Sequence, residues 1–242
     1  MTTSQSTLRS IALAQPATIR VFERYNLDYC CGGNRPLAQA CAEKGLDVDA
    51  VLAGLADAAN GNRPVPPDMS GATPTEIVRH IVTTHHMYVT SELARLLPMA
   101  QKVAAKHGPN HPELEELEAQ LAQLADELLA HLWKEEIILF PYVVAQDASL
   151  RGNADAPHAC FATVESPIAA MVQEHEGAGA LLAAMRAATG GFTPPVGTCP
   201  TVAGLLEGLD AFERDLHRHI HLENNLLFPM AIEMEKRALV AR

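Results

Sequence analysis

The stretch HLWKEEIILFP, residues 131–141, and the stretch HIHLENNLLFP, residues 219–229, fit one template, H-x-x-x-E-x-x-[IL]-L-F-P. In both, a histidine and a glutamate lie four residues apart inside an apolar run. Residues four apart share one face of an α-helix, about one turn from each other, so both side chains can reach a common ion. The function then depends on whether that face points into a core.

The apolar positions around both pairs predict that each pair faces a core. A bundle-facing stripe repeats in alternating steps of three and four residues. The first pair lies on such a stripe: Leu114, Leu117, Leu121, Leu124, Leu128, His131, Glu135, Ile138 and Tyr142. The second lies on another: Val202, Leu205, Leu209, Phe212, Leu216, His219, Glu223, Leu226 and Met230. Two further stripes carry one histidine each, and these are Phe161, Val164, Ile168, Met171, His175, Ala178, Leu182 and Met185, and Val82, His86, Val89, Leu93 and Leu96.

The composition of the whole chain agrees with an all-α protein. The 242 residues are 48% hydrophobic and only 5% aromatic, without β-branched strand runs. Segments rich in helix breakers separate the four stripes, at 107–112, 147–158 and 189–200. We therefore predict an up-down-up-down four-helix bundle preceded by a small N-terminal helical domain. The Gly- and Pro-rich segment 61–74 places the boundary near residue 65, which gives domains 1–65 and 66–242.

Charge and apolar runs exclude several classes of partner. The formal net charge of −11 disfavours nucleic acid and anionic membrane surfaces. No run approaches the roughly 18 apolar residues of a membrane helix, and the N-terminal stretch resembles no secretory signal. Five cysteines at irregular spacing do not form a disulfide framework. We expect a cytoplasmic protein with reduced thiols that binds neither nucleic acid nor a membrane.

The histidines and glutamates on the four stripes predict a metal centre. A single histidine on such a stripe is more often an ordinary core residue, but here four histidines and two glutamates face one another. Isolated carboxylates in an apolar core cost several kcal/mol, and the stripes carry no Lys or Arg to neutralise them. A bound cation supplies that charge. The candidate ligands are His86, His131, Glu135, His175, His219 and Glu223.

Six ligands exceed the need of one tetrahedral zinc, whereas two metals bridged by both glutamates would each take two histidines. This mixed nitrogen and oxygen set suits iron best, then manganese, and zinc less well. We expect the two Phe-Pro pairs to close their helices just past the metal layer. The remaining histidines lie off the stripes or in loops, and we expect them at the surface: His80, His85, His107, His111, His158, His217 and His221.

Residues 74–235 resemble a hemerythrin-like, HHE cation-binding domain, through the paired H-x-x-x-E motifs that end in LFP. The resemblance implies the same six ligands, with Glu135 and Glu223 bridging two non-haem irons. Two features differ from oxygen-carrying hemerythrins. Gly179 stands where a fifth histidine is expected, and the last helix has H-x-x-x-E in place of H-x-x-x-x-D. The lost histidine implies an additional exchangeable position, which favours reaction with small ligands over reversible O2 carriage.

Two acidic residues flank the candidate ligands. Glu127 lies one turn before His131, and Glu174 directly precedes His175. Each is either a solvated flank of its helix or a partner that orients an imidazole. The alternative role is proton delivery to the metal centre.

The stretch LDYCCGGNRPLAQAC, residues 27–41, is the second unusual feature. Cys30 and Cys31 precede two glycines and a helix that we expect to start at Pro36. They are either small turn residues or redox thiols, because a thiol near a helix N-terminus tends to have a lowered pKa. A disulfide between adjacent cysteines is strained and would be easily reduced.

The segment DYCCGG, followed by L-A-x-A-x-x-x-K-x-L-D-x-D, resembles the N-terminal domain of the repair-of-iron-centres family. The resemblance implies a cytoplasmic di-iron protein that restores damaged iron–sulfur centres under nitrosative and oxidative stress. Our first hypothesis is reduction of NO to N2O at a diferrous site, with Cys30 and Cys31 relaying electrons or accepting nitrosyl groups. The alternatives are a non-catalytic iron donor and a di-iron O2 or redox sensor. Implied partners are NO or another diatomic ligand, an electron donor and iron–sulfur client proteins, for a monomer or homodimer.

Overall fold

The computed structural model describes residues 2–60 and 67–240, and its regular elements are helices. Within these ranges the only extended pairing is a single bridge between Thr7 and Pro36. The predicted all-α class is confirmed. The predicted domain boundary near residue 65 lies outside the described residues.

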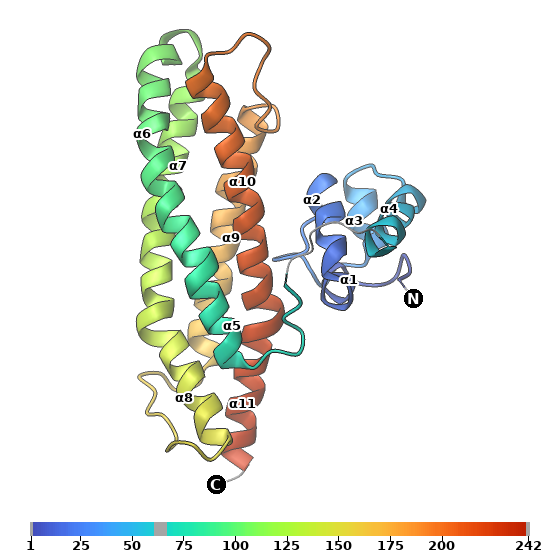
Figure 1. The fold of residues 1–242 in the computed structure, drawn as a ribbon, viewed down its shortest axis with the longest axis vertical. Coiled ribbons are helices and arrows are strands. Elements are labelled where there is room, and N and C mark those ends of the chain that lie inside the picture. Colours follow the sequence, from blue (N-terminus) through green and yellow to red (C-terminus); the bar gives the residue numbers. More distant parts are fainter. Residues whose placement is uncertain (1, 61–66, 241–242) are drawn as a thin grey trace.

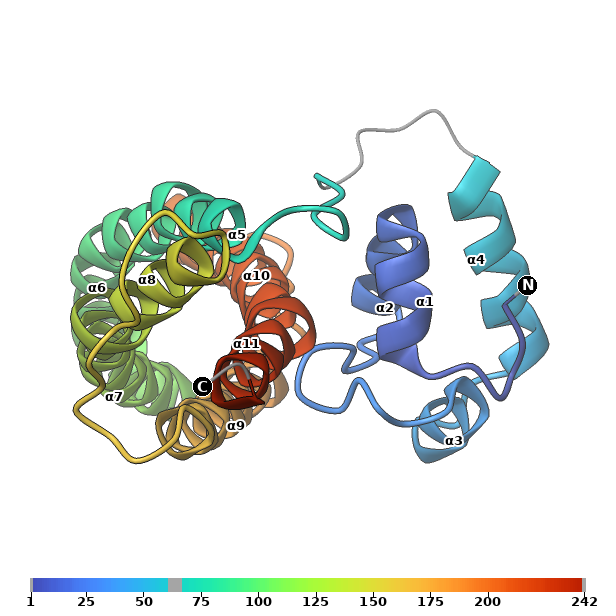
Figure 2. The ribbon, with the colours of Figure 1, turned by 90° about the horizontal axis from the view of Figure 1, so that it is seen from below.

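Four long helical rods form the bundle and run up and down in turn (Figures 1 and 2). The first rod consists of α5 (Pro74–His80), η2 (Ile81–His86) and α6 (Met87–His107). A short turn, η3 (Gly108–Asn110), leads to the second rod, α7 (Pro112–Lys134), η4 (Glu135–Leu139) and α8 (Phe140–Leu150). The third is α9 (Glu165–Ala188). The fourth consists of α10 (Pro200–Leu222), η5 (Glu223–Leu227) and α11 (Phe228–Val240).

The first rod begins with a capping box. The Thr73 hydroxyl accepts the N–H of Glu76 at 3.2 Å, and the Glu76 carboxylate accepts the N–H of Thr73 at 2.8 Å. These bonds satisfy two backbone donors that a helix start leaves free, and Pro74 at the first position has no donor to satisfy. The chain therefore enters the bundle at a defined point, and α5 followed by the π turn η2 leads from there to His86.

The segments η2, η4 and η5 are π-helical turns, and they shift the buried face by one residue. Beyond Glu135 the buried positions are Leu139 and Val143 instead of the predicted Ile138 and Tyr142, which are only partly buried. In the fourth rod, the buried residues Leu227 and Ala231 likewise replace the predicted Leu226 and Met230. A π turn bonds residue i to i+5 and so contains one residue more than an α-helical turn.

The expectation that Phe-Pro ends each helix is wrong, because α8 and α11 continue through Pro141 and Pro229. A proline inside an α-helix lacks its N–H and clashes with the carbonyl four residues earlier. For Pro141 that carbonyl belongs to Ile137, which lies inside the widened turn η4. Within the π turn the backbone hydrogen bonds run from i to i+5, so the bond that the proline cannot donate is not needed. The helix therefore continues through Pro141.

The N-terminal part consists of α1 (Leu8–Ala14), η1 (Pro16–Thr18), α2 (Ile19–Arg24), α3 (Leu37–Glu43) and α4 (Val48–Asn60). It has its own core, which includes Leu8, Phe22, Leu37, Val51 and Leu55. These helices lie beside α10 and α11 (Figure 2). The Arg218 guanidinium joins the two parts by donating to the Glu23 carboxylate at 2.8 and 2.9 Å. Among the described helices, none is long and apolar enough to cross a membrane.

Candidate metal centre

The structure brings all six predicted ligands together inside the bundle. Their exposed fractions are at most 2%, and the residues are His86, His131, Glu135, His175, His219 and Glu223. Glu135 and Glu223 open the π turns η4 and η5, His131 and His219 lie four residues before them, and His86 closes η2, whereas His175 lies on the uninterrupted helix α9. π turns are frequent at functional sites because they re-aim side chains within a rigid helix.

The six side chains form two clusters that share both glutamates. One cluster contains His86, Glu135, His219 and Glu223, and the other contains His131, Glu135, His175 and Glu223. In each cluster, one ligand atom from every residue lies within 4.8 Å of the others. The Nε2 atoms of the paired imidazoles face each other, at 3.2 Å for His86 and His219 and at 3.0 Å for His131 and His175. This arrangement is consistent with two metal ions bridged by two carboxylates.

The polar atoms at the centre fit metal ions better than they fit each other. Within the described part of the chain, both oxygens of Glu135 and Oε2 of Glu223 accept no hydrogen bond. The nearest imidazole nitrogens are close, with His131 Nε2 at 3.2 Å from Glu135 Oε1, but they are not aligned as donors. Buried carboxylate oxygens without partners are costly, and cations placed between imidazole and carboxylate would satisfy them.

Proton affinities at the centre indicate the same need for positive charge. Burial would raise the pKa of Glu223, but the imidazoles of His219 and His175 hold it well below its ordinary value. Burial would lower the pKa of His131, but the carboxylates of Glu135, Glu223 and Glu174 together outweigh burial and raise that pKa to about 9. In the metal-free protein, protons on imidazoles therefore take the place that cations would hold.

Three of the four ligand imidazoles are oriented by a hydrogen-bond partner at Nδ1, the ring nitrogen that faces away from the metal clusters. The Nδ1 atoms of His86, His131 and His175 lie 2.7, 2.7 and 3.0 Å from oxygens of Glu136, Glu174 and Asn224. A hydrogen bond at Nδ1 directs Nε2 towards the metal. The Nδ1 of His219 has no such partner in the described ranges.

The phenylalanines of the two LFP motifs cover ligand imidazoles from other helices. Phe140 stacks on His86 with 5.6 Å between ring centroids, and Phe228 stacks on His175 at 6.0 Å with nearly parallel planes. Both phenylalanines are 2% exposed. The motif therefore seals the metal centre from one end.

Glu174 and Glu127 both border a cavity of about 240 Å³ that reaches the imidazoles of His131 and His175. The Glu174 carboxylate also pairs with Lys134, and this ion pair with the His131 contact holds the pKa of Glu174 below its ordinary value despite partial burial. Glu127 is exposed and accepts a hydrogen bond from Gln123 at 2.9 Å. Of the two acidic residues, Glu174 contacts a candidate ligand, whereas Glu127 is bonded within its own helix.

Two histidines that we expected at the surface are buried. His85 lies in the π turn η2, its Nδ1 is 3.0 Å from Asp215 Oδ1, and its ring stacks on His219 at 5.6 Å. His221 accepts a hydrogen bond from Asn225 at 2.9 Å. It is buried because the N-terminal part covers that face of α10, which the periodicity of the helix could not reveal.

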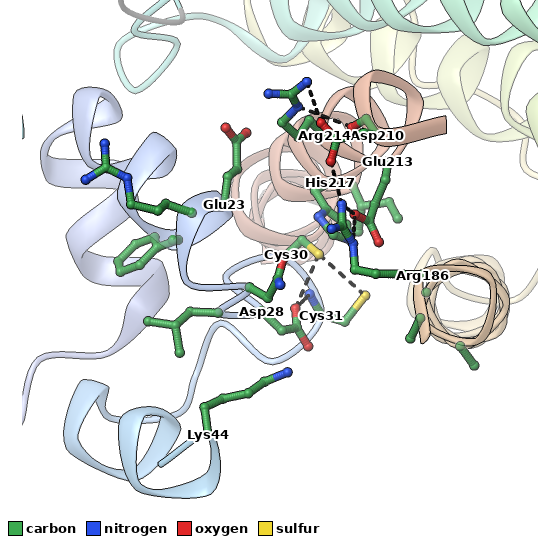
Figure 3. Close-up of a pocket in the computed structure, with 18 of the residues that line it drawn as sticks. Glu23, Asp28, Cys30, Cys31, Lys44, Arg186, Asp210, Glu213, Arg214 and His217 are labelled. Atoms are coloured by element: carbon green, nitrogen blue, oxygen red, sulfur yellow. Dashed lines mark hydrogen bonds and ion pairs between the residues drawn. The ribbon is translucent and has the colours of Figure 1, made fainter. Parts of the chain in front are cut away.

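The cysteine turn docks on the bundle beside α9 and α10 (Figure 3). Asn225 holds it by donating to the carbonyls of Tyr29 at 3.2 Å and Cys30 at 3.3 Å. All five cysteines are free thiols in this structure. The pKa of Cys30 is well above its ordinary value, because its thiol donates to Cys31 and because it is buried. The expectation of a lowered pKa is therefore wrong for Cys30.

Sequence comparisons agree with both parts of the fold. Residues 78–231 match the family model described as "Hemerythrin HHE cation binding domain", and residues 4–59 match ScdA_N, "Domain of Unknown function (DUF542)". The chain is thus a hemerythrin-type cation-binding protein with an ScdA_N domain. "Iron-sulfur cluster repair protein YtfE" of Escherichia coli O81 (strain ED1a) is 36% identical over 228 residues, which cover 94% of this chain and 97% of that protein. The protein of the same name from Escherichia fergusonii gives the same identity and coverage. The chain belongs to the repair-of-iron-centres family.

Proposed function

We propose that this protein repairs iron–sulfur centres damaged by nitrosative and oxidative stress, and that its bundle holds two irons. The observation that carries the proposal is the pair of buried clusters that share Glu135 and Glu223. Relatives of nearly equal length are named for iron–sulfur cluster repair, which supports iron as the metal and iron–sulfur proteins as clients. An imidazole and carboxylate donor set also suits iron.

His86 and His219 would hold one iron, His131 and His175 the other, and the two glutamates would bridge them. When bound, two adjacent ferrous ions supply the two electrons that couple two NO molecules and two protons into N2O and water. An external electron donor then restores the reduced state.

The protein's own residues provide access and protons for this reaction. The cavity beside His131 and His175 is a route by which a diatomic ligand can approach the centre. Glu174 lies on that route with Lys134 as its ion-pair partner. It can pass protons inward from solvent while it orients His131, and Glu127 at the outer wall is the next candidate in that path.

Anaerobic mixing of the diferrous protein with NO, followed by gas chromatography for N2O, tests the reaction. We expect N2O in proportion to the protein. At equal iron content, the rate per di-iron centre should fall in Glu174→Gln and change less in Glu127→Gln. Formation of a stable nitrosyl adduct without any N2O would rule out the reaction.

A second candidate function is iron donation to apo iron–sulfur proteins. It is favoured by the position of Cys30 and Cys31, which line a large cleft away from the buried centre. Iron-loaded protein as the sole iron source should rebuild a cluster in an apo acceptor that is supplied with sulfide and reductant. No cluster under these conditions would exclude donation.

A further inference from the structure

We propose that Asp28, Cys30 and Cys31 form a separate metal site, which holds one thiophilic divalent cation at the interdomain cleft. A carboxylate oxygen and the two sulfurs lie within 4.8 Å of one another. The site shares no residue with the two clusters in the bundle. Its existence does not depend on which reaction the bundle performs.

The thiol contacts show where such a cation would sit. The Cys30 thiol is in donor range of Asp28 Oδ1 at 3.3 Å and of Cys31 Sγ at 4.0 Å. A cation that replaces the thiol protons meets the same three atoms. Binding is then M²⁺ + 2 RSH → M(SR)₂ + 2 H⁺, a ligand exchange that needs no oxidant or reductant.

The turn that carries these ligands is held in shape before any ion binds. Oxygens of Asp28 accept the N–H groups of Cys31 and Gly32, each at 2.9 Å. A Cβ on Gly33 would lie 2.7 Å from the Tyr29 carbonyl oxygen, so this close turn requires glycine. Together with the two hydrogen bonds from Asn225, these contacts fix the sulfurs beside the carboxylate.

The charges around the site balance for a divalent ion. Two thiolates and the Asp28 carboxylate carry three negative charges. Arg35 lies 3.2 Å from Asp28 and adds one positive charge, so one M²⁺ makes the group neutral. Arg35 is also anchored by Glu43 at 2.7 Å, which holds the guanidinium to the side of the sulfurs.

The open side of the site faces a cleft of about 830 Å³ between the N-terminal part and helices α9 and α10 (Figure 3). Structural metal sites are closed by four protein ligands, whereas three ligands and an open position allow exchange with another molecule. Lys44 lies at the same cleft and can contact an acidic segment of a client. The site is therefore suited to transfer of an ion, not to its permanent storage.

Titration of the full-length, iron-loaded and reduced protein with Co²⁺ under argon tests the site. We expect one Co²⁺ per chain in addition to the bundle iron, with a thiolate-to-cobalt charge-transfer absorption. The double variant Cys30→Ser/Cys31→Ser should lose both the absorption and the extra cobalt and keep its iron. Asp28→Asn should keep the absorption but bind cobalt more weakly.

The matched control is Cys160→Ser, which removes an exposed thiol elsewhere and should bind cobalt as the unchanged protein does. Thiol counts before titration show whether Cys30 and Cys31 are reduced, and iron content with helical circular dichroism reports folding. No extra cobalt in protein with both thiols reduced would overturn the proposal. Extra cobalt that survives in a folded Cys30→Ser/Cys31→Ser variant would overturn it equally.

Discussion

The two π turns η4 and η5 have the same backbone and the same leading glutamate, but they have different neighbours. In η4, Glu135 is followed by Glu136. The Glu136 carboxylate is half-exposed at the surface of the bundle and contacts the buried His86. In η5, Glu223 is followed by Asn224, which contacts His175, and by Asn225, which contacts the cysteine turn. One half of the repeat therefore faces solvent, and the other carries the N-terminal part.

The residues of η5 connect the metal clusters to the N-terminal part of the chain. Three consecutive residues of η5 serve the metal clusters, the orientation of His175 and the docking of the Cys30 turn. The same turn therefore contacts the metal clusters through Glu223 and the carbonyls of the cysteine turn through Asn225. Among the described residues, the corresponding turn η4 shows no hydrogen bond to the N-terminal part.

The largest effect on metal binding is expected at Glu135 and Glu223, the residues that open η4 and η5 and in which the two turns are alike. Glu135→Ala or Glu223→Ala removes a carboxylate shared by both clusters, so each variant should lose both metals. Metal analysis of the purified proteins measures this loss. Glu127→Ala, on the exposed side of α7, is the control and should retain them. Two metals in either bridging variant would contradict the shared role.

Phe140→Ala and Phe228→Ala should each destabilise the fold by about 3–5 kcal/mol, because each removes a fully packed ring beside a ligand imidazole. Urea unfolding of the metal-free proteins measures the loss. Similar values are expected, since both rings follow a π turn in the same way. A loss below 1 kcal/mol for one ring would show that its turn is packed differently.

Asn225→Ala should cost about 1–3 kcal/mol, because it leaves two carbonyls of the docked turn without their donor. We expect faster alkylation of Cys30, which is otherwise buried. Asn110→Ala, in the turn between α6 and α7, is a matched control and should leave that rate unchanged. If the alkylation rate of Cys30 were unchanged in Asn225→Ala, the hydrogen bonds from η5 would not be what keeps the cysteine turn docked.

The six buried ligands could be predicted because each lies on a periodic apolar face: five lie on faces that no π turn interrupts before them, and His86, at the end of η2, shares the face of Val89 and Leu93 that follows it. Ile138 and Leu226 were assigned to those faces wrongly, since a π turn adds a residue and no local pattern marks it. The same turns explain why Pro141 does not end its helix.

Glu136, Asn224 and Asn225 could not be found from the sequence, because each acts on a residue more than 45 positions away. A helix register reports which face a residue occupies, but it does not report which other helix or domain meets that face. The one available signal was position, since all three lie one or two residues after a predicted glutamate ligand.

Glu136→Gln and Asn224→Ala compare a charged with a neutral partner of a ligand imidazole. Each should weaken metal binding by roughly 10–100-fold, and the loss should be larger for Glu136→Gln because the carboxylate also raises the basicity of His86. Competition with a chelator of known affinity measures both. Gln101→Ala, an exposed position on α6, is the control, and equal effects of the two variants would show that partner charge is unimportant.

The last comparison concerns pH, which distinguishes metal-loaded from metal-free protein. Because the folded pKa of His131 is raised to about 9 from 6.5, its protonated form stabilises the metal-free fold fully below pH 6.5. That contribution is lost as pH rises from 6.5 through 9. Urea unfolding after chelation should show this decline, reduced in Glu174→Gln, which removes one carboxylate partner of His131. With metals bound, His131 Nε2 holds no proton, so this decline should be absent, and its persistence would place His131 outside the coordination of either ion.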